Sequence, residues 1–241
     1  MIRTIFVWSC IVLSGFFFGS LAILSYLLDR KGEMAHVCAR LWGKVCLLAD
    51  GIHVRIEGLE QVPDKGPYIF MSNHQGSYDI FALMGRLPYQ FKWLSKKEIF
   101  SIPIIGWAMS AAGYISIDRE GTRETVEAMN KAARKIQEGA SVVIFPEGTR
   151  SADGSIQPFK KGGFTLAVKS KVPIVPIAIS GSREIMAKGR LAIHPGDIRV
   201  RIGPPIETAH CSTKDRQALM DRVREAISSQ FKMISDSQIV M

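Results

Sequence analysis

The chain has 241 residues, which is enough for one domain of ordinary size and an appendage but not for two full domains. Hydrophobic residues make up 47% of the sequence and charged residues 22%. The chain can therefore bury a core, and it is not intrinsically disordered, collagen-like or a disulfide-stapled miniprotein. The formal net charge of +9 favours a partner rich in phosphate, and both nucleic acid and anionic lipid fit that description.

The first feature along the chain is an apolar segment, because no charged residue occurs between Ile5 and Leu28. As a helix this segment would be roughly 36 Å long, enough to cross the ~30 Å hydrocarbon core of a bilayer. The alternatives are a signal peptide, for which the segment is too long and lacks a convincing cleavage site, and a buried core helix. We predict a membrane-anchoring helical segment over residues 1–50, with residues 5–28 as its hydrophobic part.

Basic residues flank this apolar segment unequally. Only Arg3 precedes it, whereas the basic residues that follow closely are Arg30, Lys31, Arg40 and Lys44. The positive-inside rule then places the bulk of the chain on the cytoplasmic side, at the inner membrane if the cell is bacterial.

Residues 34–50 have the pattern of an amphipathic helix. His36, Arg40 and Lys44 recur at a spacing that places them on one basic face. Such a helix either lies on a membrane surface or packs on the domain with a solvated basic face. A hairpin of both segments that enters one leaflet and returns is a further possibility.

Strand patterns and helix patterns alternate from about residue 51 onward. Polar and apolar residues alternate over 52–56 and 198–202, continuous apolar runs cover 68–71, 141–145 and 174–179, and helical spacing covers 122–138 and 214–231. We predict an α/β fold for residues 51–241, a single domain with a largely parallel central sheet flanked by helices.

The peptide Asn73-His74-Gln75-Gly76-Ser77-Tyr78-Asp79 follows the first continuous apolar run. In a helix, His74 and Asp79 would lie about 140° apart, so they can meet only if His74 precedes the helix and Asp79 lies in its first turn. Asp79 would then orient the imidazole and leave its other nitrogen free to act as a base. The alternative is an ordinary helix start in which His74 is structural.

A second peptide, Phe145-Pro146-Glu147-Gly148-Thr149-Arg150-Ser151, follows another apolar run. Its glycine allows the backbone to approach a ligand closely, and the guanidinium of Arg150 suits a phosphate or carboxylate group. The alternative is a β-turn with an exposed ion pair. The sequence does not have the spacing of a phosphate-binding Walker loop.

Further basic residues lie in other loops: Lys96, Lys97, Arg119, Lys160 and Lys161. Each could be a solvated surface charge, but together at one rim they would form an anion site. The four cysteines and five histidines have no zinc-ligand spacing, so we expect no metal and read the cysteines as reduced.

The two peptides, in this order and separated by some 70 residues, resemble the glycerolipid acyltransferase superfamily. Gly113-Tyr114-Ile115-Ser116-Ile117-Asp118-Arg119 and Val172-Pro173-Ile174-Val175-Pro176-Ile177 match two further blocks of that superfamily in the same order. The resemblance covers about residues 53–205 and is greatest to the branch that acylates 1-acyl-sn-glycerol-3-phosphate (lysophosphatidic acid). Ser116 departs from it, at a position where a bulkier apolar residue is commoner.

The resemblance implies acyl transfer without a covalent enzyme intermediate. His74, oriented by Asp79, would deprotonate the sn-2 hydroxyl of 1-acyl-sn-glycerol-3-phosphate, which would attack the thioester of acyl-CoA or acyl carrier protein and give phosphatidic acid. Backbone N–H groups near the start of the helix after His74 would stabilise the oxyanion. The residues implied in substrate binding are Lys96, Lys97, Arg119, Glu147, Gly148, Thr149 and Arg150. The expected partners are membrane lipid, the acceptor and the acyl donor, with no separate cofactor.

Other functions compete with this one. The same chemistry could act on glycerol-3-phosphate, another lysophospholipid or a lyso-ornithine lipid. A lipid hydrolase is disfavoured because the sequence has no G-x-S-x-G peptide. A non-catalytic basic module that binds membranes would give His74 no special role, and a nucleic-acid module would leave the apolar segment unexplained.

Overall fold

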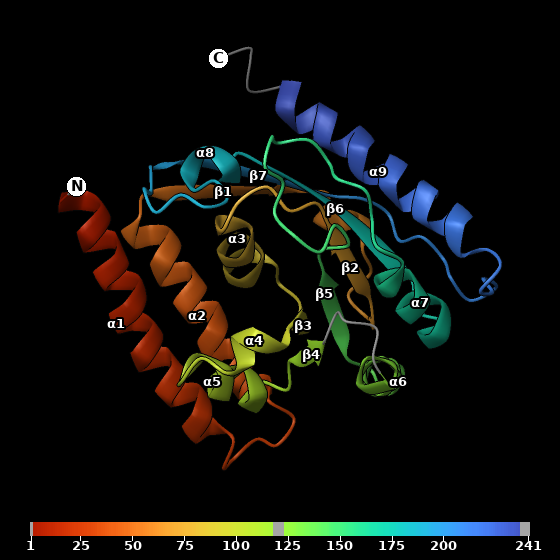
Figure 1. Cartoon of the computed structure of the whole chain (residues 1–241), viewed down its shortest axis with the longest axis horizontal. Helices are drawn as coiled ribbons and strands as arrows, with labels where there is room; N and C mark the ends of the chain where they lie inside the picture. Colours follow the sequence, from red (N-terminus) through yellow and green to blue (C-terminus); the bar gives the residue numbers. More distant parts are fainter. Residues whose placement is uncertain (1, 118–122, 237–241) are drawn as a thin grey trace.

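A seven-stranded sheet forms the centre of the protein, in the strand order β1-β7-β6-β2-β5-β3-β4 (Figure 1). The computed structural model describes residues 2–117 and 123–236. The strands are β1 (Ile52–Glu57), β2 (Ile69–Ser72), β3 (Phe91–Lys96), β4 (Ile115–Ile117), β5 (Ser141–Ile144), β6 (Ile174–Ser180) and β7 (Gly196–Ile202). Five neighbouring strands are parallel, namely β6, β2, β5, β3 and β4. Strand β7 runs antiparallel to β6 and parallel to β1. The predicted largely parallel sheet is confirmed.

Helices cover both faces of this sheet (Figure 1). They are α1 (Ile2–Ser25), α2 (Glu33–Ala49), α3 (Tyr78–Arg86), α4 (Lys97–Phe100), α5 (Ile105–Ala111), α6 (Arg123–Gln137), α7 (Lys161–Ser170), α8 (Ser182–Ile185) and α9 (Arg216–Asp236), with a 3₁₀ turn at Leu59–Gln61. One buried core lies between the sheet and α1, α2, α3 and α5, and a second lies between the sheet and α6, α7 and α9. Strands β2, β5 and β6 are buried along their whole length, which explains their continuous apolar sequences.

The elements expected from the sequence are present, with small shifts in their ends. The expected helix over 122–138 is α6, although Thr122 lies outside the described residues. Val126, near the start of this helix, is exposed. Strands β3 and β4 and helices α4, α5, α7 and α8 were not predicted. Lys92 and Lys96 interrupt the apolar pattern of β3, and β4 has only three residues.

Helices α1 and α2 form a hairpin that packs against the domain. The Trp42 indole N–H donates to the Ile11 carbonyl of α1 (3.3 Å), and the Trp8 indole N–H donates to the Leu191 carbonyl of the domain (3.0 Å). At the turn of the hairpin, the Lys92 ammonium on β3 donates to the carbonyls of Lys31 and Gly32 (3.0 and 3.2 Å). The hairpin is therefore attached to the domain at both ends.

Helix α2 packs closely against α3, and Asp50 after α2 is bonded to the first residue of α3. A Cβ atom on Gly43 would lie 3.0 Å from the backbone nitrogen of Gly85, closer than most such contacts, so glycine favours this close approach of the two helices. The Tyr78 hydroxyl, at the first residue of α3, donates to the buried carboxyl group of Asp50, directly after α2. Burial raises the pKa of this carboxyl group.

His36 does not belong to an exposed basic face, which corrects that part of the prediction for residues 34–50. It is fully buried, its Nδ1 lies 3.0 Å from the Tyr114 hydroxyl, and its ring lies edge-on to Phe91. Burial lowers the pKa of His36 to about 3, with smaller contributions from Lys92 and Arg40, so the ring is neutral. The exposed residues of α2 include Lys44, but most are apolar: Met34, Val37, Leu41, Val45 and Leu48.

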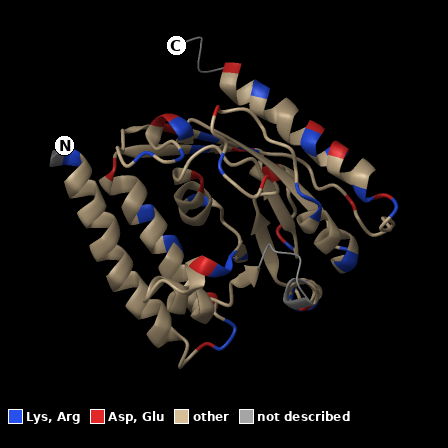
Figure 2. Cartoon of the chain, in the orientation of Figure 1, with Lys and Arg blue, Asp and Glu red and all other residues tan. Residues whose placement is uncertain are grey.

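Helix α1 is the one helix of the described residues that is long and apolar enough to cross a membrane, over Arg3–Ser25. Figure 2 shows it without charged residues except at its start. Val7, Ile11 and Ala22 are buried against the rest of the protein, whereas Leu13 and Phe17 are exposed. The helix thus has one face on the protein and one free apolar face.

Candidate active site

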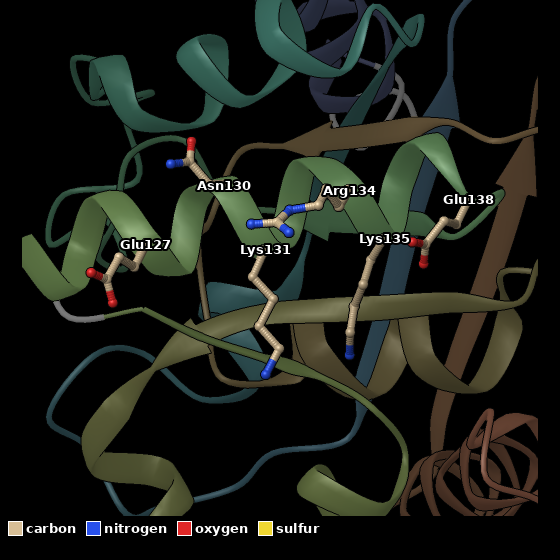
Figure 3. A pocket seen from close by; sticks show the side chains of 6 residues that line it. All are labelled: Glu127, Asn130, Lys131, Arg134, Lys135 and Glu138. Atoms are coloured by element: carbon tan, nitrogen blue, oxygen red, sulfur yellow. The ribbon is translucent and has the colours of Figure 1, made fainter.

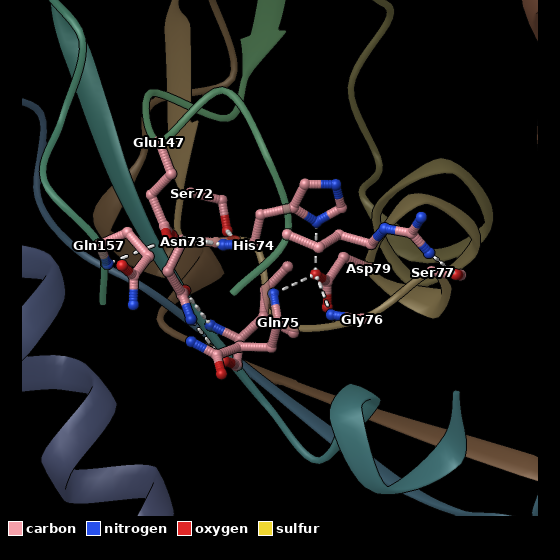
Figure 4. A network of polar contacts seen from close by, with 11 residues as sticks. Ser72, Asn73, His74, Gln75, Gly76, Ser77, Asp79, Glu147 and Gln157 are labelled. Carbon is pink, nitrogen blue, oxygen red and sulfur yellow. Dashed lines mark hydrogen bonds and ion pairs between the residues drawn. The ribbon is translucent and has the colours of Figure 1, made fainter. Parts of the chain in front are cut away.

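His74 and Asp79 meet at the carboxyl end of β2 (Figure 4). His74 lies in the loop after β2, and Asp79 lies in the first turn of α3, the arrangement that their spacing required. Their Nδ1 and Oδ2 atoms are 2.7 Å apart, and the His74 side chain is 12% exposed while that of Asp79 is fully buried. The pair is thus largely buried, and only a small part of the His74 side chain is exposed.

The contacts of Asp79 determine which imidazole nitrogen carries the proton. Its Oδ2 atom also accepts hydrogen bonds from the backbone N–H groups of Gln75 (2.7 Å) and Gly76 (3.0 Å). A carboxylate that accepts these bonds has no proton to donate, so Nδ1 of His74 is the donor. In the neutral ring Nε2 then has a free lone pair, as a base requires.

The backbone N–H groups around His74 already have protein acceptors. The N–H of His74 donates to Glu147, those of Gln75 and Gly76 donate to Asp79, and that of Ser77 donates to the Met186 carbonyl. The four N–H groups of residues 74–77 are therefore occupied within the protein. That N–H groups near the start of α3 bind the oxyanion stays a prediction.

The Phe145–Ser151 peptide lies beside His74 because β5, which precedes it, pairs with β2. The Ser151 N–H donates to the His74 carbonyl (2.7 Å), and the His74 N–H donates to Oε1 of Glu147 (2.7 Å). The other Glu147 oxygen accepts the Gln157 N–H (3.0 Å). Glu147 is buried, and its two oxygens connect the backbone of the His74 loop to that of the segment around Gln157 (Figure 4).

Burial raises the pKa of Glu147 to about 7, against the effect of the two backbone N–H bonds. Between the ordinary value of 4.5 and about 7, the folded protein binds more protons than the unfolded chain. The free energy of unfolding therefore decreases by about 3 kcal/mol as the pH rises through this range. Glu147→Gln has no carboxyl group to titrate, so we expect its free energy of unfolding not to show this decrease. Relative to wild type, the stability of the variant should therefore rise between pH 4.5 and 7.

Urea titrations at several pH values in detergent measure this difference. Glu225→Gln, at an exposed site on α9, is the matched control for the loss of one negative charge. Parallel stability profiles for wild type and Glu147→Gln would contradict the prediction. Glutamine has a single acceptor oxygen, so this variant also leaves one backbone N–H without its bond.

The other candidate binding residues lie around this loop. Arg150 is half-buried and its Nη1 donates to the Ser77 hydroxyl, just before α3. Gly148 has a φ of 73°, which favours glycine, and its N–H donates to the Phe145 carbonyl (3.0 Å). Thr149 is exposed. The turn therefore directs Arg150 towards the start of the helix that carries Asp79.

The lysine candidates are divided between two edges of this region. Lys96 and Lys97 are exposed where β3 ends and α4 begins, and β3 pairs with β5. Lys160 and Lys161 are exposed at the start of α7, and the Lys160 N–H donates to the Pro146 carbonyl (2.8 Å). Arg119 lies outside the described residues.

Three residues that contribute to the His74 site were not singled out in the sequence. The Asn73 side chain pairs with both backbone groups of Ile179 on β6 (2.8 and 2.9 Å), Gln157 supplies a backbone N–H to Glu147, and the Phe145 ring faces His74. Asn73 and Phe145 belong to the two peptides and could have been found there. Gln157 contributes only its backbone, which no residue pattern marks.

A separate hollow of about 560 Å³ lies along α6 (Figure 3). Its lining mixes cations and carboxylates from this single helix: Glu127, Asn130, Lys131, Arg134, Lys135 and Glu138. Since α6 covers the face of the sheet opposite α3, this hollow is not part of the His74 site.

Comparison with known proteins shows the family of this chain. The family model described as Acyltransferase matches residues 53–180, just over half of the chain. The chain belongs to the acyltransferase family. The match begins in β1 and ends with β6, so it includes both peptides of the His74 site.

Curated members of the family are similar over most of the chain. A chloroplastic 1-acyl-sn-glycerol-3-phosphate acyltransferase of Brassica napus is 39% identical over 87% of this chain and 60% of its own length. The alpha enzyme of the same name from Homo sapiens is 38% identical over 77% and 66%. That of Saccharomyces cerevisiae is 30% identical over 99% and 80%. The chain spans 60% and 49% of the lengths of the Brassica napus enzyme and an Arabidopsis thaliana relative.

A solved member of the family has the same fold. The crystal structure of the 1-acyl-sn-glycerophosphate (LPA) acyltransferase from Thermotoga maritima matches with a TM-score of 0.83 and 26% identity. The match covers 97% of this chain and 95% of that chain, so it includes the α1–α2 hairpin as well as the domain.

Proposed function

We propose that the protein transfers an acyl chain from a thioester donor to the sn-2 hydroxyl of 1-acyl-sn-glycerol-3-phosphate, giving phosphatidic acid. The names of the similar family members support the acceptor. The observation that carries the mechanism is the 2.7 Å hydrogen bond from His74 to Asp79, which leaves Nε2 as a base beside the Arg150 turn.

In the proposed reaction, Nε2 of His74 takes the proton of the acceptor hydroxyl while the hydroxyl oxygen attacks the thioester carbonyl carbon. The tetrahedral intermediate collapses with cleavage of the C–S bond, and the leaving sulfur takes the proton from the imidazolium. Asp79 stabilises the imidazolium between these two steps. The products are the new ester and a free thiol, and His74 returns to its neutral form.

Arg150 is proposed to hold the phosphate of the acceptor, together with Lys96, Lys97 or Arg119. A guanidinium offers paired donors to phosphate oxygens, and Arg150 lies against the loop between His74 and Asp79. This places the phosphate near the base, so that the hydroxyl is brought to Nε2. Gly148 and Thr149 are proposed to form the turn around the acceptor phosphate. Glu147 is proposed to hold the His74 backbone in place.

Purified protein assayed with a panel of acceptors tests the substrate. We expect 1-acyl-sn-glycerol-3-phosphate to be acylated faster than glycerol-3-phosphate, other lysophospholipids and a lyso-ornithine lipid. The same assay with acyl-CoA and with acyl carrier protein identifies the donor. A preference for glycerol-3-phosphate would overturn the acceptor, and release of fatty acid without any acceptor would indicate a hydrolase.

We infer that the α1–α2 hairpin attaches the protein to one leaflet, with the domain on the cytoplasmic side. A helix that crosses the bilayer would be surrounded by lipid, whereas α1 makes contacts with the domain from Arg3 to Ala22. The exposed apolar faces of α1 and α2 are then available to the membrane. The excess of basic residues after α1 supports the cytoplasmic side.

Leu13→Asp combined with Phe17→Asp tests this attachment. Both residues are exposed on α1, so the charges should leave folding intact and lower partitioning into vesicles by roughly tenfold or more. Vesicle flotation measures the bound fraction. The matched control is Val126→Asp with Met233→Asp, at two exposed apolar sites on α6 and α9. Equal losses in both double variants would contradict a specific role of the hairpin.

A further inference from the structure

The imidazole of His74 lies flat against the ring of Phe145. The two ring centroids are 3.9 Å apart and the planes are inclined by only 10°. Phe145 directly follows β5, whereas His74 follows β2, so the pairing of these strands brings the rings together. The His74 ring is therefore held by two contacts: Asp79 on its edge at Nδ1, and Phe145 on its face.

The Phe145 ring is itself held by the core. The indole of Trp93 on β3 stacks on it, with centroids 5.6 Å apart and planes inclined by 22°. Trp93 is buried and lies edge-on to Phe91 (5.3 Å), which in turn contacts the buried ring of His36 on α2 (4.5 Å). A row of aromatic rings thus extends from α2 across β3 to His74, and Phe145 is its last member before the imidazole.

We propose that Phe145 is a positioning residue for the reaction, which orients the His74 ring and stabilises its protonated form in the transition state. The inference rests on the proposed function of His74 as a base. Rotation of the imidazole about its bond to Cβ would break the parallel contact with Phe145 as well as the bond to Asp79. Two contacts at right angles therefore keep Nε2 in one direction.

The contact with Phe145 also becomes stronger as the reaction proceeds. The face of an aromatic ring carries partial negative charge, and a cation within about 6 Å of its centroid is attracted to it. His74 is neutral before the reaction and becomes an imidazolium as it takes the hydroxyl proton. An interaction that is stronger in the transition state than in the ground state raises kcat and leaves KM largely unchanged.

Phe145→Leu removes the aromatic face and keeps an apolar side chain of similar bulk. We expect kcat to fall roughly tenfold, the size of an aromatic contact with a cation, with KM for both substrates within about twofold of wild type. Phe145→Tyr keeps the ring and should retain most of the activity. Phe231→Leu, at a half-buried ring that packs in the opposite core, is the matched control and should keep wild-type kcat.

A double-mutant cycle distinguishes positioning of His74 from a general structural effect. In a His74→Ala background, Phe145→Leu should lower the remaining activity by less than about twofold, because the ring on which it acts is gone. An equal loss in both backgrounds would overturn the proposal. If His74→Ala itself keeps full turnover, the proposed function of His74 fails, which is a separate outcome of the same experiment.

Proton NMR of His74 gives a readout independent of turnover. The ring current of Phe145 should shift the His74 ring protons upfield, and this shift should be lost in Phe145→Leu and kept in Phe145→Tyr. An unchanged His74 spectrum together with unchanged kcat in Phe145→Leu would overturn the proposal. If Phe145→Leu does not fold, Phe145→Met, which also lacks an aromatic face, replaces it in both measurements.

Discussion

Replacing His74 with alanine is expected to lower kcat by roughly 10²- to 10⁴-fold, the range that a positioned general base contributes. An alcohol is a poor nucleophile until its proton is removed during attack, and Nε2 of His74 is proposed to remove it. KM should change little, because the phosphate of the acceptor is proposed to bind Arg150 rather than the imidazole. Release of the thiol from the acyl donor at saturating acceptor measures the effect.

His53→Ala is the matched control for this variant. His53 lies on β1 with a side chain that is 81% exposed, so its removal should leave turnover unchanged. Folding of His74→Ala is checked by its thermal transition and by its binding to vesicles. Full turnover in a folded His74→Ala protein would exclude the base and would favour the non-catalytic membrane-binding alternative.

Asp79→Asn is expected to have an effect of similar size, roughly 10²- to 10⁴-fold on kcat. One carboxylate oxygen of Asp79 accepts three hydrogen bonds, from Nδ1 of His74 and from the N–H groups of Gln75 and Gly76. Asparagine has nearly the same shape, but it is uncharged and can offer its NH₂ group to the imidazole. That group would favour the tautomer with the proton on Nε2, which cannot act as the base.

The double variant His74→Ala/Asp79→Asn separates this mechanism from a loss of structure. If Asp79 acts through the imidazole, the double variant should be no less active than His74→Ala. Asp197→Asn, at an exposed site on β7, is the control for the same chemical change and should be fully active. A further loss in the double variant would assign Asp79 a role that does not depend on His74.

Much of the fold and the pairing of His74 with Asp79 could be predicted from residues close together in the sequence. Continuous apolar runs marked β2, β5 and β6 because strands covered by helices on both faces are buried along their length. Five residues separate His74 from Asp79, so a loop followed by one helical turn is sufficient to bring them into contact. The position of Arg150 after β5 followed from the same pattern.

The contacts of His74 with Glu147 and Phe145 join segments about seventy residues apart and could not be predicted. Glu147 binds backbone N–H groups of His74 and Gln157, and every residue has such a group, so the sequence carries no sign of these bonds. Phe145 meets the imidazole only because β5 pairs with β2 in one register.

The orientation of α2 also required the tertiary structure. Its sequence has a basic and an apolar face, yet in the structure His36 is buried and most of the exposed residues are apolar, while Gly43 lies close to Gly85. A pattern within one helix shows that its faces differ. Which face is buried depends on the surface that packs against it, because burial is a property of both partners.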